Sequence, residues 1–516
     1  MTMEIRVLQG DVTEIETEAL CLGIFRGTRE PGGAAGAVDR ALGGAISDLL
    51  RSGEFRGRRG ETLLFPTLGK LPARRVLLVG LGERERFSAE AVREAAAAAA
   101  NAALHLSELS TVVHGAGIGG LAPEGAAQAL VEGAILGRYR FRKYRRDGED
   151  EAPTPKLERL QLVEFDAAKV EALERGAARG EAVAEAVGWA RDLANEPGNA
   201  LPPEELAARA QALAREHGAM RCEVLTEREL EAEGLGGILG VARGSARPPR
   251  LIVLEYTPPG FEGESPVVLV GKGVTFDSGG ISLKAREGMD AMKYDMAGAA
   301  AVLGAVKALA ALEVPMRVIA LVPAVENLPD GNALKPGDVI PMGDGKRVEV
   351  TNTDAEGRLI LADALVYARR YAPRAVVDLA TLTGACIVAL GKEAAGLFGN
   401  DAALLAAIRE AAETSGERVW ELPLYEEYRE LLRSEVADLK NSVLGRGALP
   451  QAGAAAGAMF LREFVEYPWA HLDIAGTAFD VETRLYCPKK GATGYGVRLL
   501  VELIERLSRS ASPPKG

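Results

Sequence analysis

Short apolar runs alternate with longer amphipathic stretches along the first part of the chain. Residues Ile5–Leu8 form a strand-like run that is followed by a turn at Gly10-Asp11, and Val76–Val79 form an apolar run that ends at Gly-Leu-Gly. Both runs have the length of strands. The stretch Ala89–Ala103 has the length and composition of a helix. Alternating strands and helices predict an N-terminal α/β layer domain.

The same alternation returns after residue 195 and continues almost to the end of the chain. The sequence predicts strands at Leu251–Leu254, Val267–Val270, Val318–Val322 and Val376–Leu379, and helices at Ala297–Leu312 and Leu359–Tyr371. This order is typical of a mixed, mainly parallel sheet with helices on both faces. The fold class is therefore α/β, with a smaller N-terminal domain and a larger C-terminal α/β domain.

Two changes in the pattern predict where the domains meet. The basic and aromatic run Tyr139–Arg146 is followed at once by the acidic, proline-containing stretch Asp147–Pro155. Residues 166–194 are rich in Ala, Glu, Arg and Leu and contain no proline, which predicts one long helix. We therefore expect a domain over residues 1–160, a linker helix within 161–194 and a second domain over 195–516.

The composition of the chain indicates which classes of protein and which cellular compartment are compatible with it. The 516 residues carry a net charge of −12, which disfavours non-specific binding of nucleic acid. The four cysteines are far apart and form no CxxC pair, which is typical of a reducing compartment. The N-terminus has no signal-peptide pattern, and no run of about 18 apolar residues is uninterrupted by charge. We expect a soluble, cytoplasmic protein with no membrane partner.

The histidines exclude one large class of metal site. Only His105, His114, His217 and His471 occur, and no two of them have the i, i+4 spacing of an HExxH zinc site. A metal ion in this protein must therefore be held mainly by oxygen ligands.

A first group of charged residues follows the strand predicted at Val267–Val270. Lys272, Asp277, Lys284 and Asp295 lie within one short, glycine-rich stretch after that strand. Open α/β sheets bind their ligands at such strand ends. An alternative is that Asp295 caps the next helix and the lysines are solvated. A phosphate-binding P-loop is excluded, because proline stands where its first glycine is needed and glycine follows Lys272.

A second group lies in the segment Asn352–Leu359, just before a predicted helix. Thr353 and Glu356 have the spacing of a capping box, which is the structural interpretation of this segment. Asp354, Glu356 and Arg358 alternate, however, so in an extended segment all three would point to one side. An acidic pair and an arginine directed together favour a functional site over a cap alone.

The two groups together contain four carboxylates, which would repel one another in one cleft unless cations neutralise them. Asp277, Asp295, Asp354 and Glu356 offer the hard oxygen ligands that suit two divalent ions roughly 3.5–4 Å apart. Such a pair lowers the pKa of a bridging water and supplies a hydroxide nucleophile. The sequence therefore predicts a hydrolase.

The motifs Val270–Gly280 and Asn352–Leu359 resemble the two signatures of the leucyl aminopeptidase family, which are cytosolic two-metal exopeptidases. Seven further blocks resemble family blocks in family order: Asn195–Asn199, Glu326–Asp330, Lys335–Asp338, Asp378–Gly384, Ala437–Asn441, His471–Gly476 and Gly491–Gly494. The close resemblance covers about residues 190–500.

The resemblance implies a role for each charged residue of the predicted site. Asp277 and Glu356 would bridge two metal ions, with Lys272 and Asp295 completing the shell of one and Asp354 that of the other. Lys272 would coordinate as a neutral amine, its proton being displaced by the adjacent cations. Lys284 would stabilise the oxyanion, and Arg358 would hold a bicarbonate that acts as the general base.

The family also implies the substrate, the metal and the assembly. Met292, Thr381, Gly384 and Ala475 match positions that line the pocket for the first side chain, which suits leucine or another apolar residue. The expected cofactors are two divalent ions per subunit, Mn²⁺ or Zn²⁺. The expected substrates are short peptides and the expected assembly is a homohexamer. The chain departs from the family pattern at Ala456, where a residue with a hydroxyl group is usual. This difference bears on the detail of the pocket and not on catalysis, because Ala456 is not at a metal-ligand position.

Two further functions remain open from the sequence. Gly10–Thr13 and Gly32–Asp39 are similar to the phosphate-cradling loops of macro domains, which bind ADP-ribose, and the aminopeptidase family carries a related N-terminal fold. The basic run Arg138–Arg146 is compatible with an accessory role in DNA binding. Helix packing and salt bridges explain the same run equally well. A catalytically inactive homologue is disfavoured, because all seven chemically demanding positions are present.

Overall fold

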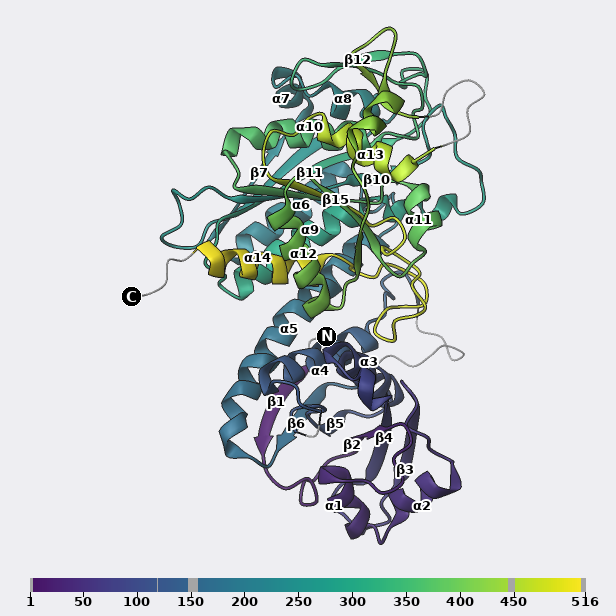
Figure 1. Ribbon diagram of the computed structural model, residues 1–516, viewed down its shortest axis with the longest axis vertical. Helices are drawn as coiled ribbons and strands as arrows, with labels where there is room; N and C mark the ends of the chain where they lie inside the picture. The colour runs from purple at the N-terminus through teal and green to yellow at the C-terminus, as the bar shows by residue number, and fades with distance from the viewer. Residues whose placement is uncertain (1–2, 118, 147–155, 444–450, 512–516) are drawn as a thin grey trace. The chain divides into compact units, whose positions relative to one another are not determined.

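The computed structural model describes residues 3–117, 119–146, 156–443 and 451–511 (Figure 1). The chain forms two compact units. One contains Met1–Gly188 together with Glu482–Lys489, and the other contains Trp189–Val481 with Lys490–Gly516. The boundary predicted at residue 160 lies inside a strand of the first unit. That residues 482–489 belong with this unit was not predicted.

The N-terminal unit is built around a six-stranded sheet in the order β1-β6-β5-β2-β4-β3. All neighbours are parallel except β3 and β4. The strands are β1 Glu4–Gln9, β2 Leu20–Phe25, β3 Thr62–Pro66, β4 Arg75–Gly82, β5 Glu108–Val112 and β6 Arg159–Glu164. The helical elements are α1 Gly33–Ala41, α2 Ala45–Ser52, η1 Arg84–Arg86, α3 Ala89–Ala102 and α4 Pro123–Arg138. The predicted α/β layer domain is confirmed.

A single 29-residue helix, α5, spans Ala167–Asn195, and each of its ends lies one residue later than the corresponding end of the stretch predicted as one long helix, residues 166–194. It ends where Asn195 is followed by Pro197 and Gly198, because proline removes a backbone donor and disfavours helical geometry before it.

The C-terminal unit contains a nine-stranded sheet in the order β16-β15-β18-β14-β9-β11-β8-β7, with β10 paired to β11 beside this path. The central pairs are parallel, while β7, β8 and β11 form antiparallel pairs, as do β15 and β18. The strands are β7 Met220–Leu225, β8 Arg250–Tyr256, β9 Val267–Gly271, β10 Gly273–Asp277, β11 Val318–Asn327, β14 Ala375–Ala380, β15 Ala395–Gly399, β16 Val419–Glu421 and β18 Trp469–Asp473. This confirms a mixed, mainly parallel sheet.

Helices cover both faces of this sheet (Figure 1). On one side lie α7 Glu227–Ala232, α8 Gly236–Ala242, α10 Gly357–Ala368 and α13 Gly453–Arg462. On the other lie α6 Pro203–Glu216, α9 Ala297–Ala311, α12 Ala402–Ser415 and α14 Val497–Ala511. The remaining elements are η2 Met289–Met296, η3 Arg369–Tyr371, α11 Gly384–Leu390, η4 Glu426–Leu432, and a small sheet of β12 Val339–Pro341, β13 Arg347–Glu349 and β17 Leu439–Lys440.

The sheet is a buried core that the helices cover on both faces. Successive residues of β9, such as Val268 and Leu269, are fully buried although their side chains point to opposite faces. Among the described residues, one helical stretch, Met289–Ala311, is long and apolar enough to cross a membrane, but 89% of its apolar window is buried inside the protein. An apolar helix buried to this extent is a core helix of the folded unit.

The carboxyl ends of parallel strands bring distant segments to one edge of this sheet. Lys272 follows β9, Asp277 ends β10 and Thr381 follows β14. Strands β9 and β14 are hydrogen-bonded neighbours, and β9 and β10 both pair with β11. The edge therefore places side chains about 100 residues apart in sequence within reach of one another.

Candidate active site

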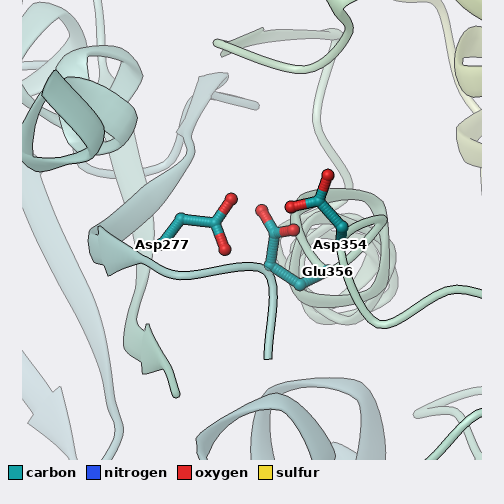
Figure 2. A group of neighbouring side chains, drawn as sticks. All are labelled: Asp277, Asp354 and Glu356. Carbon is teal, nitrogen blue, oxygen red and sulfur yellow. The ribbon is translucent and has the colours of Figure 1, made fainter. Parts of the chain in front are cut away.

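Three carboxylates from two separate segments form a tight cluster at this edge. Asp277 ends β10, while Asp354 and Glu356 lie in the turn that leads into α10. Each offers an oxygen that lies within 4.8 Å of the others. Figure 2 shows the three carboxylates directed toward one another. Like charges at this separation are unfavourable without a compensating cation.

Lys272 lies between Glu356 of this cluster and a fourth carboxylate, that of Asp295. Its Nζ is 2.7 Å from Asp295 and 2.8 Å from Glu356, and it donates to the Thr381 carbonyl at 2.9 Å. A glycine at position 357 makes this approach possible, because a Cβ there would lie 2.5 Å from the Lys272 side chain. Burial lowers the pKa of Lys272, but Asp295, Glu356 and Asp277 outweigh this and raise it overall.

Lys284 lies in the loop that follows β10 and contacts the cluster from there. Its Nζ lies 2.8 Å from Asp277 and also pairs with Asp354. The loop that carries it turns at Gly279, where φ is +87° and a side chain would be strained. Burial lowers the pKa of Lys284, while the neighbouring carboxylates raise it overall, so the amine stays protonated.

The lysines do not neutralise the cluster completely. Burial, with a contribution from Asp277, raises the pKa of Glu356 to about 8, and burial also raises the pKa of Asp295 to about 6. The Oε2 atom of Glu356 is buried and has no hydrogen-bond partner among the described residues. A hard-oxygen donor set with an orphaned buried acceptor fits divalent cations.

Arg358 lies beside the cluster, in the first turn of α10. Its Nη1 donates to the Asn441 carbonyl at 2.8 Å, whereas its buried Nε has no hydrogen-bond partner in the described part of the chain. Burial lowers the pKa of this guanidinium to about 10, so it remains charged at neutral pH. An unused donor on a buried cation suits a small anion.

The capping interpretations of both motifs are wrong. The N-cap of α9 is Met296 and no side chain caps it, so Asp295 does not act as a cap. The N-cap of α10 is Glu356, again without a side-chain cap, and the Thr353 hydroxyl donates to the Gly279 carbonyl at 2.7 Å. This bond ties the two motif segments together instead.

The expected extended segment at Asp354–Arg358 is also not observed. Glu356 has helical dihedral angles and Arg358 is already in α10. A tight turn, and not strand-like alternation, brings Asp354 and Glu356 together.

A cavity of about 380 Å³ adjoins the cluster and brings all eleven predicted site residues together. Its charged lining consists of Lys272, Asp277, Lys284, Asp295, Asp354, Glu356 and Arg358. Its other predicted members are Met292, Thr381, Gly384 and Ala475. Ala456 does not line the cavity; it is fully buried within α13.

Sequence reasoning missed several residues of this cavity. Ile387 of α11 lines it, as do Tyr294 and Phe479, whose rings stack with centroids 4.8 Å apart. No local pattern marks these positions, because an isolated apolar residue is most often part of the core. Two residues that do not line the cavity but hydrogen-bond to its wall, Asn441 and Asp473, were also missed as individual residues, although each lies inside a block that resembles the family.

The cavity at the edge of this mixed sheet combines four carboxylates, two lysines and an arginine with apolar residues. This arrangement defines a metal-dependent hydrolase. The family model for the catalytic domain of the cytosol aminopeptidase family matches residues 188–501, and the model for its N-terminal domain matches residues 21–148. The chain therefore belongs to the cytosol aminopeptidase family and is a metallo-exopeptidase.

Relatives match over nearly the whole chain. A protein of Syntrophotalea carbinolica named "Probable cytosol aminopeptidase" is 49% identical over 95% of this chain and 97% of its own. A protein of the same name from Geobacter sulfurreducens is 46% identical over 98% of this chain and 100% of its own.

Two solved structures are similar as well. The bottromycin maturation enzyme BotP in complex with Mn is 39% identical with a TM-score of 0.82, covering 95% of this chain and 99% of that one. A tomato leucine aminopeptidase mutant is 33% identical with a TM-score of 0.86, covering 98% and 97%.

Proposed function

We propose that this enzyme removes the N-terminal residue, preferably leucine or another apolar residue, from short peptides, using two divalent ions. The observation that carries the proposal is the cluster of Asp277, Asp354 and Glu356 in the lining of a cavity that also has apolar residues in its wall. The ions proposed are Mn²⁺ or Zn²⁺; a Mn complex of a similar structure supports the choice of a divalent metal.

The proposed ligand set uses carboxylates from both charged groups of the sequence. Asp277 and Glu356 would be shared between the two ions, Asp295 would bind one ion and Asp354 the other. When bound, the ions supply Lewis-acid chemistry that activates water at neutral pH. Lys272 is held by Asp295 and Glu356 in its protonated form. Its proposed role as a neutral ligand therefore requires that the cations displace its proton.

The two remaining cationic side chains would act on the substrate and on the attacking water. Lys284 keeps its proton and lies at the cavity wall, so it can stabilise the oxyanion that forms on the scissile carbonyl. The free Nε of Arg358 supports binding of a bicarbonate, which would take the proton of the attacking water. This accounts for a site with no histidine in its lining.

The cavity lining supports an apolar first residue. Met292, Gly384 and Ala475 are small or apolar, and Ile387 and Phe479 add apolar surface to the same lining. A free α-amine would be bound beside the carboxylates, which restricts cleavage to the first peptide bond. We also propose that the enzyme acts in the cytoplasm, as the names of its relatives suggest, and that it assembles as a homohexamer.

The direct test is release of p-nitroaniline from leucine p-nitroanilide by protein loaded with Mn²⁺ or Zn²⁺. We expect turnover with at least one of these metals, loss of turnover on chelation, and recovery when metal is restored. Lysine p-nitroanilide is the matched control and should be cleaved more slowly, because a charged first side chain would lose hydration against apolar lining residues such as Met292 and Ile387. Absence of turnover with every metal would refute the proposal.

A second candidate function, binding of a nucleotide such as ADP-ribose, is supported by a cavity within the N-terminal unit. This cavity measures about 600 Å³, within the range of small-molecule sites. It is lined by the glycine-rich start of α1, where the N-cap Gly32 provides no side-chain cap. Free amides at a helix N-terminus bind phosphate. His114, 4% exposed, also lines the cavity, and burial lowers its pKa to about 4, leaving it neutral.

Replacing Ala34 by Asp tests this second function. The new carboxylate would lie in the first turn of α1, where it favours the helix but repels a phosphate. Ala403→Asp, at the equivalent position of α12, is the matched control. We expect calorimetry to show ADP-ribose binding that Ala34→Asp weakens about tenfold or more and Ala403→Asp leaves unchanged. No binding to the unmodified protein at millimolar ADP-ribose would exclude this function.

The DNA-binding alternative gains no comparable support. Arg138 donates to the Leu157 carbonyl, and Arg140 donates to the Gly137 carbonyl and to Asn101. Both side chains are thus used within the N-terminal unit, and we do not propose this role.

A further inference from the structure

Asp473 is a buried carboxylate at the end of β18 that the proposed chemistry does not use. Its exposed fraction is 0%, and it lies opposite Ala380 in the register of β18 and β14. An ionised carboxylate removed from water is costly unless hydrogen bonds satisfy it. The identity of its donors therefore indicates what Asp473 does.

All the hydrogen bonds recorded for this carboxylate come from two segments that line the substrate cavity. Oδ1 accepts from the backbone amides of Leu382 at 3.2 Å, Thr383 at 3.4 Å and Ala475 at 3.2 Å. Oδ2 accepts from the Thr383 hydroxyl at 2.6 Å. One side chain thus fixes the loop after β14 against the loop after β18.

The loop that Asp473 holds also contacts the proposed metal ligands at its other end. The Thr381 carbonyl accepts from Lys272 at 2.9 Å, and the Thr381 hydroxyl donates to Asp295 at 2.7 Å. The next three residues, Leu382, Thr383 and Gly384, line the cavity. This wall is therefore anchored to the carboxylate cluster on one side and to Asp473 on the other.

We propose that Asp473 is a positioning residue that sets the distance between the wall at 381–384 and the carboxylate cluster, and so determines how tightly the first side chain of the substrate is held. The inference rests on the proposed function of the cavity. Asp473 does not line the cavity itself and acts through Thr383 and the backbone. Because this wall contacts substrate and transition state alike, its displacement changes binding more than the chemical step.

The chain provides a matched structural control in Asp363 of α10. This aspartate is also 0% exposed, and its carboxylate accepts from the backbone amides of Ile238 and Gly343, each at 2.9 Å. It does not line the cavity. Substituting Asp363 therefore perturbs a buried carboxylate that holds loops together without moving the substrate wall.

The test compares Asp473→Asn with Asp363→Asn in the metal-loaded enzyme. Asparagine keeps the shape of the side chain and one acceptor but loses the charge and reverses the bond to Thr383. We expect Asp473→Asn to raise KM for leucine p-nitroanilide by about tenfold, with kcat within about threefold and metal content unchanged. The inhibition constant of free leucine should rise by a similar factor. Asp363→Asn should leave KM unchanged.

Thr383 supplies a second test that does not require a change at Asp473. Thr383→Val keeps the shape of the cavity wall but removes the hydroxyl that donates to Asp473, whereas Thr383→Ser keeps the hydroxyl. We expect the valine variant to raise KM and the serine variant to restore it. In the double variant with Asp473→Asn, the effects on KM should be clearly less than additive, because both substitutions alter the same Asp473–Thr383 hydrogen bond. The valine variant also loses the acceptor for the Cys386 amide, which caps α11, and the serine variant keeps it.

The outcomes separate this inference from the proposed function. If the unmodified enzyme releases no p-nitroaniline, the proposed function fails. If it does, but KM is unchanged in both Asp473→Asn and Thr383→Val, only the positioning role is refuted. An equal rise of KM in Asp363→Asn would also refute it, because the effect would then be general destabilisation.

Discussion

Replacing Lys284 by alanine is expected to lower kcat by about 100- to 1000-fold while two metal ions per chain are retained, since one preorganised oxyanion donor is worth about this much. The Lys284 ammonium lies between Asp277 and Asp354 and faces the cavity. Its removal deletes a positive charge but no proposed ligand atom. The carboxylates should therefore bind cations at least as well as before, because a competing ammonium has been removed.

The measurement pairs steady-state kinetics with metal analysis of the same samples. Lys293→Ala is the control: Lys293 lies in the same stretch of chain, donates to the Asn195 carbonyl at 3.2 Å and does not line the cavity. It should retain full kcat. If Lys284→Ala loses metal together with activity, Lys284 is a ligand and the division of roles between the two lysines is wrong.

The periodicity of the sequence predicted the elements of the fold because each is specified locally. The apolar run at Val267–Val270 could form only a short buried strand, and β9 is observed there. The division into units was less predictable. Residues 482–489 belong with the N-terminal unit through contacts such as those of Arg484 and Tyr486 with Glu90, almost 400 residues away in sequence. No local pattern can report such contacts.

The candidate site was predictable where its chemistry is concentrated in short motifs. Asp277 and Lys284 are seven residues apart, and two opposite charges so close together in a glycine-rich stretch favour a functional site. The hydrogen bonds that hold the two motif segments together could not be predicted from the sequence. Thr353 fitted a capping box equally well, and only the fold reveals that its hydroxyl reaches the Gly279 carbonyl. Asp473 could not be singled out, because a lone aspartate at a strand end has many possible uses.

Replacing Glu356 by glutamine is expected to have opposite effects on activity and on the stability of the metal-free protein. Activity should fall by about a thousandfold or more, because a shared metal ligand is lost. Burial and Asp277 raise the pKa of Glu356 from 4.5 to about 8 in the folded chain. The folded protein therefore holds a proton that the unfolded chain has already released, and without metal its stability falls as the pH rises from about 4.5 to 8.

Glutamine abolishes this pH-dependent loss because it carries no charge at any pH. Metal-free Glu356→Gln should consequently unfold a few degrees above the metal-free parent at pH 8, with no such gain near pH 4.5. Added metal should raise the unfolding temperature of the parent strongly and that of the variant little, since an ion stabilises only a fold that binds it. Thermal unfolding after chelation, measured between pH 4.5 and 9, tests both statements.

Glu326→Gln is the matched control for the Glu356 substitution. Glu326 is a buried glutamate of β11 that accepts from the Ser245 hydroxyl and does not line the cavity. It should lose neither metal nor activity. If metal-free Glu356→Gln is less stable than the metal-free parent at pH 8, the four carboxylates do not repel one another in the folded protein. The argument that they require cations would then fail. Normal metal content in that variant would remove Glu356 from the ligand set.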